Sequence, residues 1–205
     1  KLYQYVFYKR IEIMKPQKFI LTAAFSGGLL AATIGLTEAI FLLNSTGAPD
    51  QISLIYSVIL YGLIGFSIAF GDSIGGEGTG LFGNPMTFFM FRGVGGGTHP
   101  DFAPTFPLAV FAMFQMKFAI ITPAIISGSF AERIRFRSYI LFMLLFTIFI
   151  YSPLAHMTWH PEGIFRRWGV LDFAGGTVVH MSAGLAALSG AIFLGKRKMM
   201  WHKMD

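Results

Sequence analysis

The chain has 205 residues, of which 54% are hydrophobic and only 13% are charged, whereas soluble domains carry about 25% charged residues. This balance indicates an integral membrane protein, and the net charge of +6, concentrated at the termini and in loops, suits lipid headgroups rather than nucleic acid. The absence of cysteine excludes disulfides, thiolate metal sites and thiol catalysis.

The first predicted membrane span is the apolar run at residues 19–44, since a bilayer core requires roughly 20 such residues. It follows a basic and aromatic stretch, residues 1–18, which is typical of a segment lying at headgroup depth. Glu38 lies near the end of this span, where it is expected to snorkel or to bond to a neighbouring helix. A second span is predicted at residues 52–70.

A glycine-rich loop is predicted after the second span, at residues 71–104. It has no Gly-Lys-Ser/Thr ending, so a surface or re-entrant loop is expected rather than a phosphate-binding loop. Further apolar runs predict spans at residues 106–130, at residues 139–159 and from Asp172 onward. The sequence therefore predicts an all-α integral membrane fold with five transmembrane helices. Residues 1–50 are expected to form a basic segment with one atypical helix, and residues 51–205 the main membrane domain.

Positive charges on the predicted loops indicate the orientation, because basic loops favour the cytoplasmic side. Arg133, Arg135 and Arg137 follow the third span, and a basic run at residues 196–198 follows the fifth, so both are expected inside. With five spans, the basic residues 1–18 fall on the opposite side, against their own preference. Three explanations stay open: a partner or lipid that holds this segment outside, a first span that is not a simple crossing, or a separate origin of the first stretch.

Five residues could serve a membrane function, and each also has a purely structural explanation. His180 lies roughly 12 Å into the last span, where an ionisable ring is either functional or bonded to a neighbouring helix. Phe114 and Phe118 share one helix face at spacing i, i+4, as a packing pair also would. Trp159 ends the fourth span, where tryptophan either anchors to the interface or holds a bare cation. Asp172 opens the last span, where a carboxylate caps free N–H groups.

Five stretches, in this order, resemble the ammonium transporter family of ammonium and methylammonium permeases, with the Rh proteins as relatives. They are GFSIAFG at residues 65–71, FQMKF at 114–118, AERIRF at 131–136, AHMTW at 155–159 and DFAGGTVVH at 172–180. The last stretch is the family's signature segment and is very specific. The resemblance covers about residues 55–198 and corresponds to the first of the family's two inverted five-helix repeats. Residues 1–50 do not resemble the family's first helix.

The resemblance implies a role for each of the five residues. Trp159 and Phe118 would line an outer recruitment site that holds ammonium by cation–π attraction and hydrogen bonds. Phe118 and Phe114 would form the first aromatic gate, where ammonium gives up a proton. His180 would be the first of two paired histidines in an apolar pore that passes neutral ammonia. Asp172 would shape the vestibule without touching the substrate.

The resemblance also implies surroundings and partners. Ammonium or ammonia would be the substrate, in a multi-pass protein of the cell membrane (inner or plasma membrane) that is surrounded by lipid. The partner would be a homotrimer or a second five-helix half, with a cytoplasmic regulator on the inner side. No cofactor, metal or enzyme activity is expected, because the histidines have no metal-ligand spacing and no matched nucleophile–base pair occurs. The histidines are scattered over loops and helices, at His99, His156, His160, His180 and His202.

Besides residues 1–50, two further features depart from the family pattern. The sequence shows only the first repeat, so a piece of a longer transporter and a half-protein are both expected possibilities. Lys117 also places a cation beside the gate rings and is expected to face away from the pore. The alternative to transport is a non-transporting ammonium sensor, or an accessory or structural subunit of a larger membrane complex that reuses this half-fold.

Overall fold

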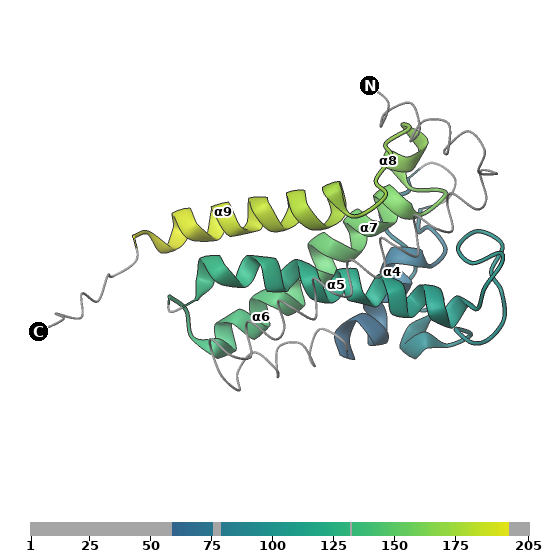
Figure 1. The fold of residues 1–205 in the computed structure, drawn as a ribbon, viewed down its shortest axis with the longest axis horizontal. Helices are drawn as coiled ribbons and strands as arrows, with labels where there is room; N and C mark the ends of the chain where they lie inside the picture. The colour runs from purple at the N-terminus through teal and green to yellow at the C-terminus, as the bar shows by residue number, and fades with distance from the viewer. Residues whose placement is uncertain (1–58, 76–78, 132, 197–205) are drawn as a thin grey trace, which may run out of the picture.

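The computed structural model describes residues 59–75, 79–131 and 133–196, which form helices, turns and two isolated β-bridges (Figure 1). The predicted all-α fold is confirmed for this part of the chain. The predicted first span and the rest of residues 1–50 lie outside the described residues.

Three described helical segments are long and apolar enough to cross a membrane: Leu108–Phe130, Phe136–Arg167 and Gly176–Leu194. They correspond to the predicted third, fourth and fifth spans. The shorter apolar helix Tyr61–Phe70 is the described part of the predicted second span. In chain order the elements are η1 (Tyr61–Gly65), α4 (Phe66–Phe70), η2 (Phe89–Phe91), α5 (Leu108–Phe130), α6 (Phe136–Phe146), η3 (Thr147–Tyr151), α7 (Ser152–Trp159), α8 (Ile164–Arg167), η4 (Gly176–Met181) and α9 (Ser182–Leu194).

The observed helix starts differ from the predicted ones for local reasons. Helix α5 begins after Pro107, whose ψ of 136° lies outside the helical range. Helix α6 begins at Phe136 rather than at residue 139, directly after the extended backbone of Arg135. The last helical segment begins at Gly176 rather than at Asp172, because Asp172 uses its side chain to cap the segment from outside.

Each described membrane segment other than α5 contains a π-helical turn, in which the helix widens by one residue. These turns are η1 before α4, η3 between α6 and α7, and η4 before α9. Pro153, near the start of α7, has no N–H to give to the carbonyl of residue 149 and would crowd it in a regular helix. A widened turn immediately before it relieves this conflict. Such turns frequently lie at functional sites, and η4 carries His180.

Helices α5 and α9 run side by side along the long axis of the molecule (Figure 1). Glycine permits their close approach, because a Cβ added to Gly190 would lie 2.3 Å from Cε1 of Phe130. Small residues allow membrane helices to approach in this way, without relying on a hydrophobic driving force. The two helices therefore hold Phe114 and Phe118 of α5 and His180 of η4 in one packed unit.

Arginine 133 ties the two basic segments to the same end of the bundle. Its guanidinium donates to the carbonyl of Ser129 in α5 at 3.0 Å. It also donates to the carbonyls of Ala191 in α9 and of Gly195 directly after α9. The turn after α5 and the end of α9 are therefore neighbours, as the charge pattern predicted.

The opposite end of the bundle is covered by residues 71–75 and 79–107, which we call the outer loop. Its backbone is bound to the end of α4, where Gly83 N–H donates to Ile68 O at 2.8 Å. Its Ser73 Oγ lies 2.8 Å from Nε2 of His156 on α7, and the other ring nitrogen of His156 lies 3.1 Å from Ala69 O. One buried imidazole thus joins the outer loop, α4 and α7.

We expect Gly83→Ala to destabilise the outer loop. A Cβ at this buried position would lie 2.6 Å from Ser67 O and 2.7 Å from Gly71 O, both fixed backbone atoms. Overpacking of this kind costs about 2 kcal/mol, so the midpoint of thermal unfolding in detergent should fall. Gly128→Ala is the control, because nothing lies within 4 Å of the added Cβ at that exposed helical position. Equal melting of both variants and the parent would contradict the close approach.

Candidate functional site

Three aromatic rings form a continuous series between α5 and α7. Phe114 and Phe118, one turn apart on α5, have ring centroids 5.0 Å apart at an interplanar angle of 87°. Phe118 is buried, and its ring lies 5.6 Å from that of Trp159 at the end of α7. The i, i+4 spacing on α5 therefore produces a ring pair, and the packing of α7 adds the third ring.

Asp172 holds Trp159 in place and caps the last helical segment. The indole Nε1 of Trp159 donates to the backbone carbonyl of Asp172 at 2.9 Å. The carboxylate of Asp172 accepts four backbone N–H groups, from Gly175, Gly176, Thr177 and Val178, at 2.6 to 3.1 Å. These are the free donors at the start of η4, where a negative charge is favoured. Gly175 has φ +86°, a left-handed conformation that lets the chain turn back onto the carboxylate.

His180 lies on η4 with its side chain exposed, whereas Val178 and Val179 on the same turn are buried. The surface around it continues down α9 as a row of exposed apolar side chains. These are Met181, Leu185, Leu188, Ile192 and Phe193, between 58% and 89% exposed. In the described residues, therefore, the imidazole is not covered by the aromatic series but lies on a largely apolar outer face.

Lys117 lies on the face of α5 turned away from the aromatic series. It is exposed, while its neighbour Phe118 is only 6% exposed. The exposed residues Val110 and Met113 of α5 precede it at helical spacing. The cation therefore does not enter the space between Phe118 and Trp159.

Three histidines, one from the outer loop and two from α7 and the turn after it, come together at the end of α7. The rings of His156 and His160 are stacked at 4.3 Å, and Phe102 lies 5.4 Å from His160 and 4.7 Å from His99. Sequence reasoning missed this group, since His99 lies about 60 residues from the other two. One signal was present: a His-Pro-acid tripeptide occurs at residues 99–101 and again at residues 160–162.

A model of the Ammonium Transporter Family matches residues 19–205. The chain belongs to the ammonium transporter family. The match begins at the start of the predicted first span, so it extends beyond the expected range of about residues 55–198, and the expectation that residues 1–50 do not resemble the family is wrong for residues 19–50.

Curated ammonium transporters are similar over much of the chain. The ammonium transporter of Aquifex aeolicus is 45% identical over 135 residues, which is 66% of this chain and 30% of that protein. The ammonium transporter of Bacillus subtilis is 42% identical over 176 residues, 86% of this chain and 40% of that protein. The chain thus spans well under half the length of these relatives.

Solved structures share the fold. Mep2 of Saccharomyces cerevisiae superposes with a TM-score of 0.70 at 29% identity, covering 86% of this chain and 41% of Mep2. A protein described as a sensor Amt protein superposes with a TM-score of 0.66 at 28% identity, covering 87% of this chain and 44% of that one. The described helices therefore correspond to one part of an ammonium transporter fold.

Proposed function

We propose that this chain takes part in moving ammonium or ammonia across the cell membrane (inner or plasma membrane), as a multi-pass protein. Ammonium is recruited at Trp159 and Phe118, gives up a proton at the gate of Phe118 and Phe114, and passes His180 as neutral ammonia. His180 accepts and relays the released proton. Family membership supports the substrate class. The roles of the five residues are supported by the contacts that link them. The ring of Phe118 lies between those of Phe114 and Trp159. Trp159 bonds to Asp172, and Asp172 caps η4, which carries His180.

The chemistry of this connected unit suits a small cation. The faces of Trp159 and Phe118, with centroids 5.6 Å apart, attract a cation through the ring quadrupole. An intact cation would lose its hydration in an apolar passage at high cost, so deprotonation at the gate lowers the barrier. An imidazole beyond the gate can accept a hydrogen bond or relay the proton. Asp172 shapes the vestibule through its four backbone bonds, with no contact to the substrate required.

We further propose that the exposed face around His180 is covered in the working assembly by a second five-helix half, which completes the pore. The exposed apolar row on α9 supports this, because the described part of the chain leaves it uncovered. A homotrimer and a cytoplasmic regulator at the basic end are the further partners expected for the family. In this scheme residues 51–205 form the membrane domain, preceded by the basic segment and first helix of residues 1–50.

The second candidate function is that of an ammonium sensor, or of an accessory or structural subunit that binds without transporting. The similarity to the sensor Amt protein supports it. Both functions use the outer site, but only transport needs His180 to be essential. Binding of ammonium with no uptake in a membrane-inserted protein would favour the sensor.

We expect Trp159→Leu to weaken recruitment, because leucine offers neither a ring quadrupole nor the Nε1 donor. In cells that lack other ammonium transporters, the KM for methylammonium should rise about fivefold, the value of a single exposed cation–π contact. Trp168→Leu is the matched control, since Trp168 is 70% exposed and lies outside the aromatic series. An unchanged KM in the Trp159 variant would contradict the recruitment role.

A further inference from the structure

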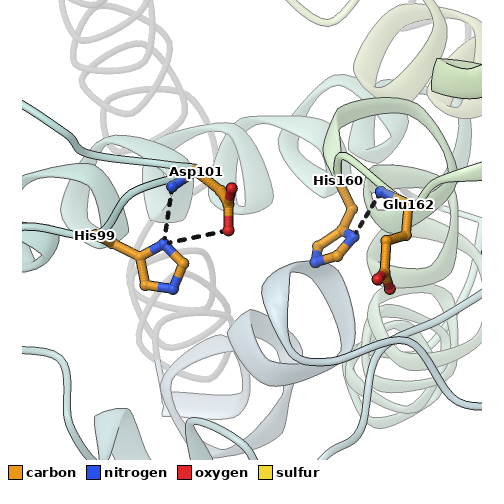
Figure 2. Close-up of polar contacts among 4 residues, drawn as sticks. All are labelled: His99, Asp101, His160 and Glu162. Atoms are coloured by element: carbon orange, nitrogen blue, oxygen red, sulfur yellow. Dashed lines mark hydrogen bonds and ion pairs between the residues drawn. The ribbon is translucent and has the colours of Figure 1, made fainter.

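Two turns of the same sequence type face one another at the end of α7. One is His99-Pro100-Asp101 in the outer loop, and the other is His160-Pro161-Glu162, directly after α7. In each turn the backbone N–H of the acidic residue donates to Nδ1 of the histidine two positions before it, at 3.3 Å for Asp101 and 3.1 Å for Glu162 (Figure 2). The proline between them presets the backbone for such a turn.

The ring of Phe102 lies between the two turns. It stacks on His99 at 4.7 Å and 24°, and lies 5.4 Å from His160 at 53°. The ring of His160 also stacks on that of His156. The two ring nitrogens of His156 bond to Ser73 of the outer loop and to Ala69 of α4. The start of α8 is also bound to the outer loop, because Ile164 N–H donates to Gly80 O at 3.1 Å.

The hydrogen bond to Nδ1 makes the closed arrangement specific for neutral histidine. A ring nitrogen that accepts a backbone N–H has no proton of its own, so His160 carries its proton on Nε2. Protonation would place a second proton on Nδ1, opposite the Glu162 N–H, and break that bond. His156, 4.3 Å away, would also face an imidazolium across a stacked pair.

We propose that the two His-Pro-acid turns and Phe102 form a proton-sensitive clasp, which holds the outer loop against the end of α7 and opens when His160 is protonated. Because Trp159 is the residue before His160, opening loosens the Trp159 ring and weakens recruitment. This last step rests on the proposed function, whereas the clasp itself does not.

The direction of the response follows from the groups that face His160. Glu162, Asp101 and Asp72 favour its charged form, while His99 opposes it and His156 stacks on its ring. In the closed arrangement the ring of His160 is buried and its Nδ1 already accepts the Glu162 N–H, and both features oppose protonation. The open state therefore binds the proton more tightly than the closed one. The clasp is fully stable above about pH 6.5, the ordinary pKa of histidine, and loses stability as the pH falls below it.

The clasp can be tested without transport, by nitrogen NMR of the histidine-labelled protein in lipid nanodiscs. At pH near 7.5, His160 should show an unprotonated Nδ1 and a protonated Nε2, and on acidification the Glu162 amide signal should move together with the ring. His160→Asn assigns the signal. A protonated Nδ1 at neutral pH, or a Glu162 amide that stays fixed while His160 titrates, would overturn the clasp.

The functional consequence is tested by methylammonium uptake between about pH 7.5 and 5.5, the range in which histidine titrates. The KM of the parent should rise about threefold on acidification. This is smaller than the rise of about fivefold expected for Trp159→Leu, because the ring is loosened and not removed. His160→Asn should abolish the rise, because an asparagine oxygen accepts the same N–H two residues on and does not titrate. Glu162→Gln keeps the backbone donor but removes a charge that favours imidazolium, so its rise should begin at lower pH.

These outcomes separate the two proposals. A rise in KM that His160→Asn leaves intact, or a parent KM that does not change with pH, would refute regulation by the clasp. Absence of uptake at every pH in a correctly inserted protein would refute the proposed function, and the NMR titration would still decide whether the clasp exists.

Discussion

Asp172→Ala should abolish methylammonium uptake and lower the stability of the protein. The substitution removes the acceptor of four backbone N–H groups at the start of η4, two on each carboxylate oxygen. Leaving such charge-assisted bonds unmade costs about 3 kcal/mol or more. The consequences extend to Trp159, whose indole is bound to the carbonyl of the same residue. Uptake in cells and thermal unfolding in detergent measure the two effects.

Asp172→Asn is the graded control for this prediction. One amide oxygen can replace the oxygen that accepts from Gly175 and Gly176, but the amide nitrogen cannot accept from Thr177 or Val178. We therefore expect an intermediate loss of stability and uptake. If the alanine variant is as stable and active as the parent, the cap does not organise the site.

His180→Ala should reduce uptake roughly tenfold, the value of one hydrogen bond to the permeating molecule, without changing the folded structure. The side chain is exposed in the described structure, so its removal leaves no cavity in the core. The measurement is the initial rate of methylammonium uptake, normalised to the amount of protein in the membrane.

Phe149→Ala is the control for His180, because Phe149 is 70% exposed on η3 and lies outside the apolar row of α9. It should elute normally on size exclusion, as His180→Ala should, and should retain most of its uptake. Normal uptake by a well-expressed His180→Ala protein would refute the pore assignment and would favour the sensor or accessory function.

The locally encoded parts of the site could be predicted from the sequence. Phe114 and Phe118 were expected on one face because helical spacing alone decides it, and their rings do pair. Asp172 was expected to cap the last helix, and all four of its backbone partners lie within six residues of it. Short-range spacing determines such contacts, so they need no knowledge of the fold.

Three relations in the site needed the tertiary structure. The sequence alone did not indicate that Trp159 would bond to the carbonyl of Asp172, or that His99 would join His160 across Phe102. The exposure of His180 likewise depends on which face of the last helix packs against its neighbours. These relations depend on how the helices rotate and cross. Apolar composition does not specify this in a membrane, because the lipid is as apolar as the helix faces.

The sequence by itself thus determined the membrane class, the positions of the described spans within a few residues, the family and the locally spaced pairs. Apolar length, charge placement and short-range spacing act through general solvation and local geometry. Only the tertiary structure decided which rings meet, which face of α9 is open and how two distant His-Pro-acid turns close on one phenylalanine. Those contacts arise from close packing between segments that are far apart in the chain.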